Sequence, residues 1–305
     1  MVYENEEVVA FLDHKPVFPG HVLLIPRRHV ERLDQLWPSE VPGLFAVLRV
    51  LSQAVPLAMQ SQGCFVANNN VVSQSVPHLH WHAVPRRKGD GLKGFFWPRH
   101  NYQDEQQRLQ IASQLRDHIA QQLILDFWFG PPGYREQQRP AWFAQDPAFD
   151  ATIGLRFGHL VEQALAGELQ HWAESKTGLL ALILLLDQFT RNLFRHTARA
   201  FAGDPQAQQL ALAAVESGRH LEFDADERVF LYLPFEHGES SQWQELSLHH
   251  YAQLPPSHAL YLDYAQRHAR VIEQFGRYPH RNEVLARPST PEEAAFLTRP
   301  ESSFW

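Results

Sequence analysis

The sequence predicts two folds in one chain: an α+β amino-terminal domain, with helices packed on an antiparallel sheet, followed by an all-α domain. Three observations predict this. Strand patterns occur only in the first third, helical spacing dominates the remainder, and 305 residues is the length of about two ordinary domains. With 44% hydrophobic and 20% charged residues, the composition is that of packed globular cores.

The amino-terminal third alternates strand patterns with helix patterns. The expected strands are 7–13 (EVVAFLD), 21–26 (HVLLIP), 64–70 (CFVANNN) and 77–85 (PHLHWHAVP). Two helices are expected, one from Ser39 as N-cap to Gly63 and one over 104–123, where apolar residues recur at roughly helical spacing. We therefore expect this domain to span residues 1–123.

The second domain is expected to span residues 124–305. Beyond Leu123 the strand patterns stop, and Leu, Ala, Gln and His dominate. The expected helices are 124–129, 148–166, 177–195, 204–217, 227–244, 257–274 and 291–297. A run of helices without strands predicts an all-α domain.

Charge and the terminal sequence limit the function classes. The net charge is −7, and it is uneven: 12 Lys+Arg against 11 Asp+Glu to Leu123, then 15 against 23. The second domain should bind nucleic acid poorly, because that affinity depends on neutralising phosphates. The longest apolar run, GLLALILLL, is shorter than the roughly 20 residues of a membrane span, and the first residues do not resemble a secretory signal. We expect a cytoplasmic protein with no membrane partner.

The stretch HLHWHAV places His78, His80 and His82 at alternate positions. In a β-strand such residues share one face, so three imidazoles should line one side of the strand over 77–85. They could bind a metal, supply a nucleophile with acid–base helpers, or form an ordinary exposed face. Strand geometry separates the outer pair by about 13 Å, which disfavours a three-ligand metal site. Nucleophilic catalysis needs only one histidine at the reacting atom.

The same stretch resembles the signature of the histidine triad (HIT) family, and the resemblance extends from AFLDHKPVFPGHVLLIPRR through NNNVVSQSVPHLHWHAVPRRKGDG. The segment before the triad is most similar to the Fhit-like branch, whose members cleave dinucleoside polyphosphates. Because His82 stands at the third position, the motif is similar to the hydrolase branches of the family and unlike its uridylyltransferase branch.

The resemblance implies a role for each histidine. His80 would attack the α-phosphorus to give a nucleotidyl-histidine intermediate, which water then hydrolyses. His82 would stabilise phosphate oxygens and protonate the leaving group, while His78 and His21 would organise the triad. An imidazole suits the reaction because it is neutral and nucleophilic near pH 7.

The resemblance also implies substrate contacts. Ser75, beside Gln74 in QSV, matches a hydroxyl position that contacts phosphate, Asp13 matches a ribose-binding position, and Asn68 is the candidate for an amide ahead of the triad. No metal and no cofactor is required by this chemistry, although Mg²⁺ could arrive with a polyphosphate substrate. Members of the family are commonly dimers, so a homodimer through this domain is expected.

A basic and aromatic segment, RRKGDGLKGFFWPR, follows the triad over 86–99. It could clamp a polyphosphate and stack a base, or its aromatic side chains could dock on the second domain. The residues favour neither interpretation.

The phrases LLDQFTRNLFRHTARAF, LYLPFEHGESSQ and EQFGRYPHRNEVLARPST are similar to the bacterial DUF924 family, which implies a TPR-like helical fold over 124–305 but no biochemical role. These phrases also carry a hypothetical anion pocket made of Arg191, Arg195, His237, Arg277, His280 and Arg281. The alternative is a set of buried Asp–Arg and His–Glu networks that join helices.

The sequence thus predicts a nucleotide hydrolase acting on a dinucleoside polyphosphate or a nucleoside-monophosphate conjugate. Two alternatives remain open. In a nucleotidyltransferase, phosphate or another acceptor would intercept the His80 intermediate. In a nucleotide-sensing module, the helical domain would engage a protein or RNA.

Overall fold

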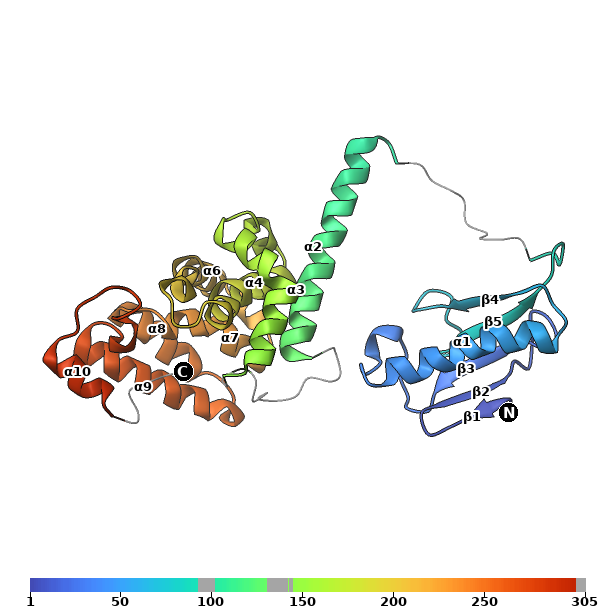
Figure 1. The fold of residues 1–305 in the computed structure, drawn as a ribbon, viewed down its shortest axis with the longest axis horizontal. Coiled ribbons are helices and arrows are strands. Elements are labelled where there is room, and N and C mark those ends of the chain that lie inside the picture. The colour runs from blue at the N-terminus through green and yellow to red at the C-terminus, as the bar shows by residue number, and fades with distance from the viewer. Residues whose placement is uncertain (93–101, 131–141, 143–144, 300–305) are drawn as a thin grey trace. The chain divides into compact units, whose positions relative to one another are not determined.

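The computed structural model describes residues 1–92, 102–130, 142 and 145–299, which form two compact units (Figure 1). The first lies within Met1–Asp104, and the second comprises Glu105–Phe129 and the described part of Glu136–Trp305. Each unit is described by itself. The sheet belongs to the first unit and the described part of the second is helical, so the predicted fold classes are confirmed.

The first unit is a five-stranded antiparallel sheet in the order β1-β2-β3-β5-β4. Its strands are β1 (Tyr3–Glu4), β2 (Val8–Leu12), β3 (Val22–Pro26), β4 (Gly63–Asn68) and β5 (Trp81–Arg86). A short 3₁₀ turn (Leu33–Gln35) precedes helix α1 (Glu40–Ala58), which lies across the sheet in Figure 1.

The core of this unit lies between the sheet and α1. Alternate strand residues such as Val8, Ala10 and Leu24 are buried, as the two-residue period of a strand requires. They pack with Leu44 and Leu48 of α1, which are one turn apart. Among the described helices, α1 is the one with the length and apolar composition of a membrane span, but this buried face also gives a core helix that composition.

The strand expected over 77–85 starts later than predicted. β5 begins at Trp81, so His82 lies on the strand, whereas His78 and His80 precede it. The backbone there bonds outside the strand ladder: Leu79 N–H donates to Val30 O (2.6 Å), and the His80 carbonyl accepts from the side chain of Asn68 at the end of β4 (2.8 Å). The prediction that the three histidines share one strand face was therefore wrong.

The second unit is built from helices that pack around one large apolar core and a smaller apolar cluster at the end of α9. Their bounds are α2 (Glu105–Phe129), α3 (Pro147–Leu165), α4 (Lys176–Ile183), α5 (Thr190–Leu193), α6 (Asp204–Glu216), α7 (Ala225–Glu236), α8 (Ser241–Tyr251), α9 (Ala259–Phe275) and α10 (Pro291–Leu297). The run Leu179–Leu186 is buried throughout, and Trp128 packs against Phe189 and Phe230.

Two helical segments differ from the prediction. The helices expected over 104–123 and 124–129 are one helix, α2, which passes through the boundary expected at Leu123 and extends well beyond its neighbours in Figure 1. The helix expected over 227–244 is two helices, because α7 ends at Glu236 and Ser240 caps α8 by accepting from Trp243 N–H.

A π-helical turn interrupts the helix expected over 177–195. Leu184–Phe189 forms this turn between α4 and α5. Single π turns inside α-helices are frequently found at functional sites. The turn contains Asp187, which is fully buried.

Candidate functional site

The histidine cluster is assembled where β3 and β5 pair. His82 on β5 is opposite Leu23 on β3, and His21 directly precedes β3. His21 is 2% exposed, and its Nε2 lies 3.0 Å from Nδ1 of His82, with ring centroids 5.1 Å apart. Strand pairing therefore brings together two histidines that are 61 residues apart.

The contacts of His21 Nδ1 determine which nitrogen of the ring carries the proton. Val17 N–H donates to Nδ1 (3.3 Å), and Asp13 Oδ2 lies 3.4 Å from the same nitrogen. Burial lowers the pKa of His21, although the Asp13 charge opposes this. With Nδ1 as acceptor, we assign the proton to Nε2, which donates to His82 Nδ1 and leaves the His82 proton on Nε2.

His80 is oriented by the backbone of its own segment. Its Nδ1 lies 2.6 Å from the carbonyl oxygen of His78, and a carbonyl can only accept. Nδ1 must therefore carry the proton, which leaves the Nε2 lone pair available for attack. The ring is edge-on to His82, with centroids 5.1 Å apart. This is the geometry that a histidine nucleophile needs.

His78 supports the cluster from outside it. Its Nε2 donates to the carbonyl oxygen of Pro26 (2.9 Å), and its Nδ1 lies 3.1 Å from Nδ1 of His29. These contacts tie the segment before β5 to the end of β3. His29 was not among the predicted site residues, although PRRHV belongs to the strand-turn-strand region that carries the resemblance.

His82 is neutral near pH 7. Burial, and then the neighbouring His21 and His80, lower its pKa to about 4, and the Asp13 charge opposes this only in part. It can therefore donate a hydrogen bond from Nε2 without first acquiring a positive charge.

This lowered pKa predicts that acid destabilises the first unit. Unfolded His82 takes up a proton near its ordinary pKa of about 6.5, and the folded unit only near pH 4. The unfolded state binds more protons in that window, so stability should fall from pH 6.5 to 4 and then level off. Urea unfolding, followed through sheet amide signals in NMR at pH 7.0 and 4.5, checks this; His82→Asn should reduce the loss, and an unchanged loss would contradict the assignment.

The other predicted substrate contacts differ in position. Asn68 and Asp13 lie beside the cluster through His80 and His21. Gln74 instead bonds to loop backbone, donating to Glu31 O (2.6 Å). Ser75 is exposed in the same loop. The structure thus brings Asn68 and Asp13 to the histidines and gives Gln74 a role in holding the loop.

The basic segment over 86–99 is only partly described. Residues 93–99, with their aromatic side chains, lie outside the described residues. Arg86 donates to Asp90 (2.7 and 3.1 Å), whose pKa this contact lowers to about 2. The Arg86 guanidinium is therefore already paired.

Three donors at the cluster could also hold a metal ion. Ligand atoms of Asp13, His21 and His82 lie within 4.8 Å of one another. Carboxylate and imidazole ligands are typical of zinc. A metal there would displace the proton shared by the two imidazoles.

The six residues of the predicted anion pocket do not form one site: three of them share a network, and the other three lie in separate contacts. Arg191 is bidentate to Asp204 (2.8 and 3.0 Å), and Arg281 donates to the same carboxylate (3.2 Å). His237 Nδ1 lies 2.7 Å from Asp187 Oδ1, and Asp187 also contacts Arg191 (3.2 Å). These residues come from separate segments and form one buried network. Asp204 was not among the predicted residues, because it lies outside the phrases that resemble the family.

The remaining members of that set lie in other contacts. Arg195 donates to Asp150 (2.6 Å), and Arg277 donates to Glu293 (2.7 Å). His280 stacks on Tyr278, with ring centroids 5.6 Å apart. Both arginines thus join helices through carboxylates, as the alternative interpretation expected.

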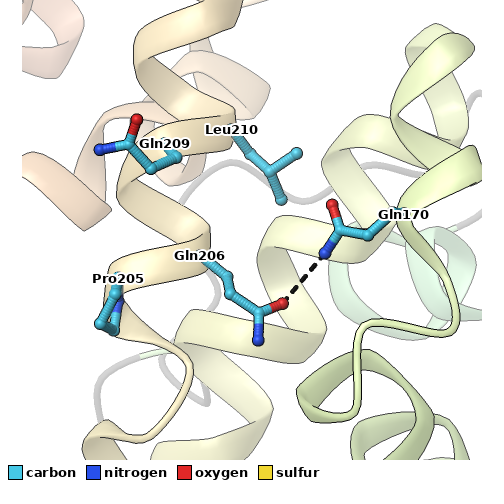
Figure 2. A pocket seen from close by; sticks show the side chains of 5 residues that line it. All are labelled: Gln170, Pro205, Gln206, Gln209 and Leu210. Carbon is cyan, nitrogen blue, oxygen red and sulfur yellow. Dashed lines mark hydrogen bonds between the residues drawn. The ribbon is translucent and has the colours of Figure 1, made fainter.

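A separate pocket of about 410 Å³ lies beside the start of α6 (Figure 2). It is lined by Gln170, Pro205, Gln206, Gln209 and Leu210, and the dashed line marks the bond from Gln170 to Gln206 (3.0 Å). Its lining has no titratable or nucleophilic side chain, so the pocket offers no catalytic group.

Comparison with known proteins gives separate matches for the amino-terminal and carboxy-terminal parts of the chain. Residues 1–89 match the HIT domain, and residues 124–301 match the family described as bacterial protein of unknown function (DUF924). A solved protein of unknown function from Agrobacterium tumefaciens is 40% identical, with a TM-score of 0.53, and the match covers 59% of this chain and 97% of that chain.

Two relatives of the first unit have named activities. The asymmetrical bis(5'-nucleosyl)-tetraphosphatase of Schizosaccharomyces pombe is 39% identical over 90 residues, which is 29% of this chain and 50% of that protein. An adenylylsulfatase of Arabidopsis thaliana is 29% identical over 126 residues, which is 39% of this chain and 62% of that protein. The chain therefore spans about half to three-fifths of the length of these relatives.

Both sequence resemblances are confirmed by these matches. The DUF924 match covers more than half of the chain, and the HIT match covers the sheet and the histidine cluster. The chain belongs to the DUF924 family of bacterial proteins and carries a HIT domain at its amino terminus.

Proposed function

We propose that the HIT domain hydrolyses the α-phosphate bond of a nucleotide conjugate through a nucleotidyl-His80 intermediate. The observation that carries the proposal is the bond from His80 Nδ1 to the His78 carbonyl, which leaves Nε2 as the nucleophile beside His82. The proposed substrates are dinucleoside polyphosphates and other nucleoside-monophosphate conjugates.

The reaction proceeds in two displacements. In the first, the Nε2 lone pair of His80 forms a bond to the α-phosphorus while the bond to the leaving group breaks. The developing positive charge on the imidazole is balanced by the Nδ1–H bond to the His78 carbonyl. In the second, water attacks the phosphorus and His80 leaves, which releases a nucleoside monophosphate.

His82 assists both displacements. Its neutral Nε2–H donates to a phosphate oxygen or to the leaving-group oxygen, and the hydrogen bonds from Val17 N–H to His21 and from His21 to His82 hold that tautomer. Phosphate charge at the site raises the proton affinity of His82, so with substrate bound the ring takes up a second proton from solvent and passes a proton to the leaving-group oxygen as an imidazolium. In the second displacement the neutral ring accepts the proton that the attacking water loses.

The relatives support a hydrolase of nucleotide conjugates at the family level. One is named a tetraphosphatase of bis-nucleosyl compounds and the other an adenylylsulfatase. The two names differ in the leaving group and agree that a nucleotide is released from a conjugate. Different leaving groups are compatible with the proposed site, because its described residues are proposed to act on the α-phosphate.

Rapid quenching of the full chain with a radiolabelled dinucleoside polyphosphate tests the proposal. We expect label bound to protein through an acid-labile bond, and its loss in His80→Ala. Adding inorganic phosphate distinguishes the transferase alternative, because a phosphorylase would release a nucleoside diphosphate in place of the monophosphate. Tight nucleotide binding without turnover would instead indicate a sensor.

Metal is expected to be dispensable and zinc inhibitory. With a nucleoside-monophosphate conjugate that lacks a polyphosphate, a chelator should leave turnover unchanged, because the proposed steps use imidazoles alone. Zinc should lower turnover by occupying Asp13, His21 and His82, and the chelator should reverse this. Loss of turnover with the chelator, restored by a divalent metal, would contradict the metal-free mechanism.

A further inference from the structure

The helical unit gathers polar side chains from separated segments at one buried place. Asp187 lies in the π-helical turn, Arg191 in α5, His237 just after α7, and Arg281 beyond α9. Asp204 at the start of α6 connects the two arginines. Nucleotide hydrolysis by the HIT domain uses none of these groups.

His237 is held as a base with one nitrogen available. Nδ1 lies 2.7 Å from Asp187, which is fully buried and also accepts from Gln188 (2.6 Å). A carboxylate can only accept at this contact, so Nδ1 carries the proton and Nε2 retains its lone pair. The side chain is 14% exposed, so solvent reaches the edge of the cluster at His237.

Arg281 has hydrogen-bonding capacity that the protein does not use. The residue is 5% exposed, and its guanidinium lies 4.4 Å from the Phe201 ring and 4.8 Å from the Tyr278 ring. Nη1 donates to Asp204, whereas Nε has no partner among the described residues. A buried donor without a partner is costly, and the Nε edge of a guanidinium matches a carboxylate or phosphate.

Two neighbouring rings, His268 and Tyr278, lie between the two groups. His268 lies 6.5 Å from the His237 ring and 5.6 Å from the Tyr278 ring that stacks on Arg281. Polar contacts thus run continuously from His237 through Asp187, Arg191 and Asp204 to Arg281.

The charges of the cluster sum to about zero, so an anion would not meet an excess of negative charge. Arg191 and Arg281 balance Asp187 and Asp204. Glu236 is buried next to His268, and burial, with the Asp187 charge, raises its pKa to about 8. It therefore stays protonated near pH 7 and adds a donor without adding a negative charge.

We propose that this cluster is a second ligand site, which binds the oxyanion group of a small molecule, a phosphate or a carboxylate, at the Nε edge of Arg281 within the polar network that includes His237. The Arg281 edge donates to two oxygens of the anion, and His237 Nε2 can accept a hydrogen bond from a protonated group of the ligand.

Histidine ring signals of the full chain in NMR, during titration with inorganic phosphate and separately with acetate, test this proposal. We expect a saturable shift of the His237 signal, identified by its loss in His237→Gln. The anion that produces the shift identifies the ligand class. Arg281→Lys keeps the charge but loses the planar edge, so the Kd should rise about tenfold or more.

Two controls separate the outcomes. Arg195→Lys, which alters a contact to Asp150 outside the cluster, should leave the Kd unchanged. His80→Ala should also leave the His237 response unchanged, so the site can succeed or fail independently of the proposed hydrolase. If Arg281→Lys does not fold, His237→Gln takes its place, and anion binding is followed through the His268 signal. The Kd of that variant should likewise rise about tenfold or more. No saturable shift with either anion, or an equal Kd in folded Arg281→Lys, would overturn the proposal.

Discussion

His80→Ala should lower turnover of a dinucleoside polyphosphate by roughly 10⁴-fold or more, because it removes the atom that bonds to phosphorus. Nucleotide affinity should change little, since the neighbouring His82 and Asn68 stay in place. Steady-state kinetics and equilibrium binding measure the two effects. His29→Ala is the matched control, because that imidazole supports His78 and is not one of the reacting groups, so its effect should be far smaller.

The nucleophile would be misassigned if His80→Ala retained substantial turnover while His82→Ala did not. His80→Gly with added imidazole provides a further measurement. A small imidazole in the vacated space should restore part of the rate, whereas a role limited to folding would not respond to it.

Asp187→Ala should destabilise the helical unit by about 3–5 kcal/mol. The change leaves a buried Arg191 with Asp204 alone and removes the acceptor of His237 and Gln188. Nearby positive charge holds the pKa of Asp187 below its usual range, so the carboxylate is charged across the neutral range. Chemical denaturation followed by helical circular dichroism measures the loss.

A surface ion pair gives the matched control. Asp263 pairs with Arg267 one turn later on α9, with both side chains nearly half exposed. Exposed pairs contribute little, so Asp263→Ala should stay within about 0.5 kcal/mol of the parent. Equal losses in the two variants would show that the Asp187 network adds no stability of its own.

The sequence was sufficient for much of the fold. Helical periodicity predicted α3, α6, α9 and α10 to within about two residues, because each turns apolar residues toward a buried cluster. The break between α7 and α8 escaped prediction, since apolar residues continue up to Phe235 and the break depends on the cap at Ser240.

The candidate site was predictable as a set of residues and less so as a geometry. Alternation identified His78, His80 and His82, yet β5 begins after two of them. Spacing could not show that Leu79 N–H donates to Val30, or that the Asn68 side chain donates to the His80 carbonyl, because both hydrogen bonds join distant segments. In the helical unit, the charge pattern left open an anion pocket and a set of ion-pair networks, because the partners Asp204 and Glu293 come from elsewhere in the chain.

The π-helical turn at Leu184–Phe189 is the place where this segment can best change in length. Such a turn holds about one residue more than an α-helical turn, so the extra residue is absorbed within the turn. Deleting one position there would yield a regular helix and would leave Arg191 on the side of Asp204, whereas a deletion in the α-helical part would rotate the residues beyond it by about 100°. We expect length differences between homologues in this segment to fall at the π-helical turn.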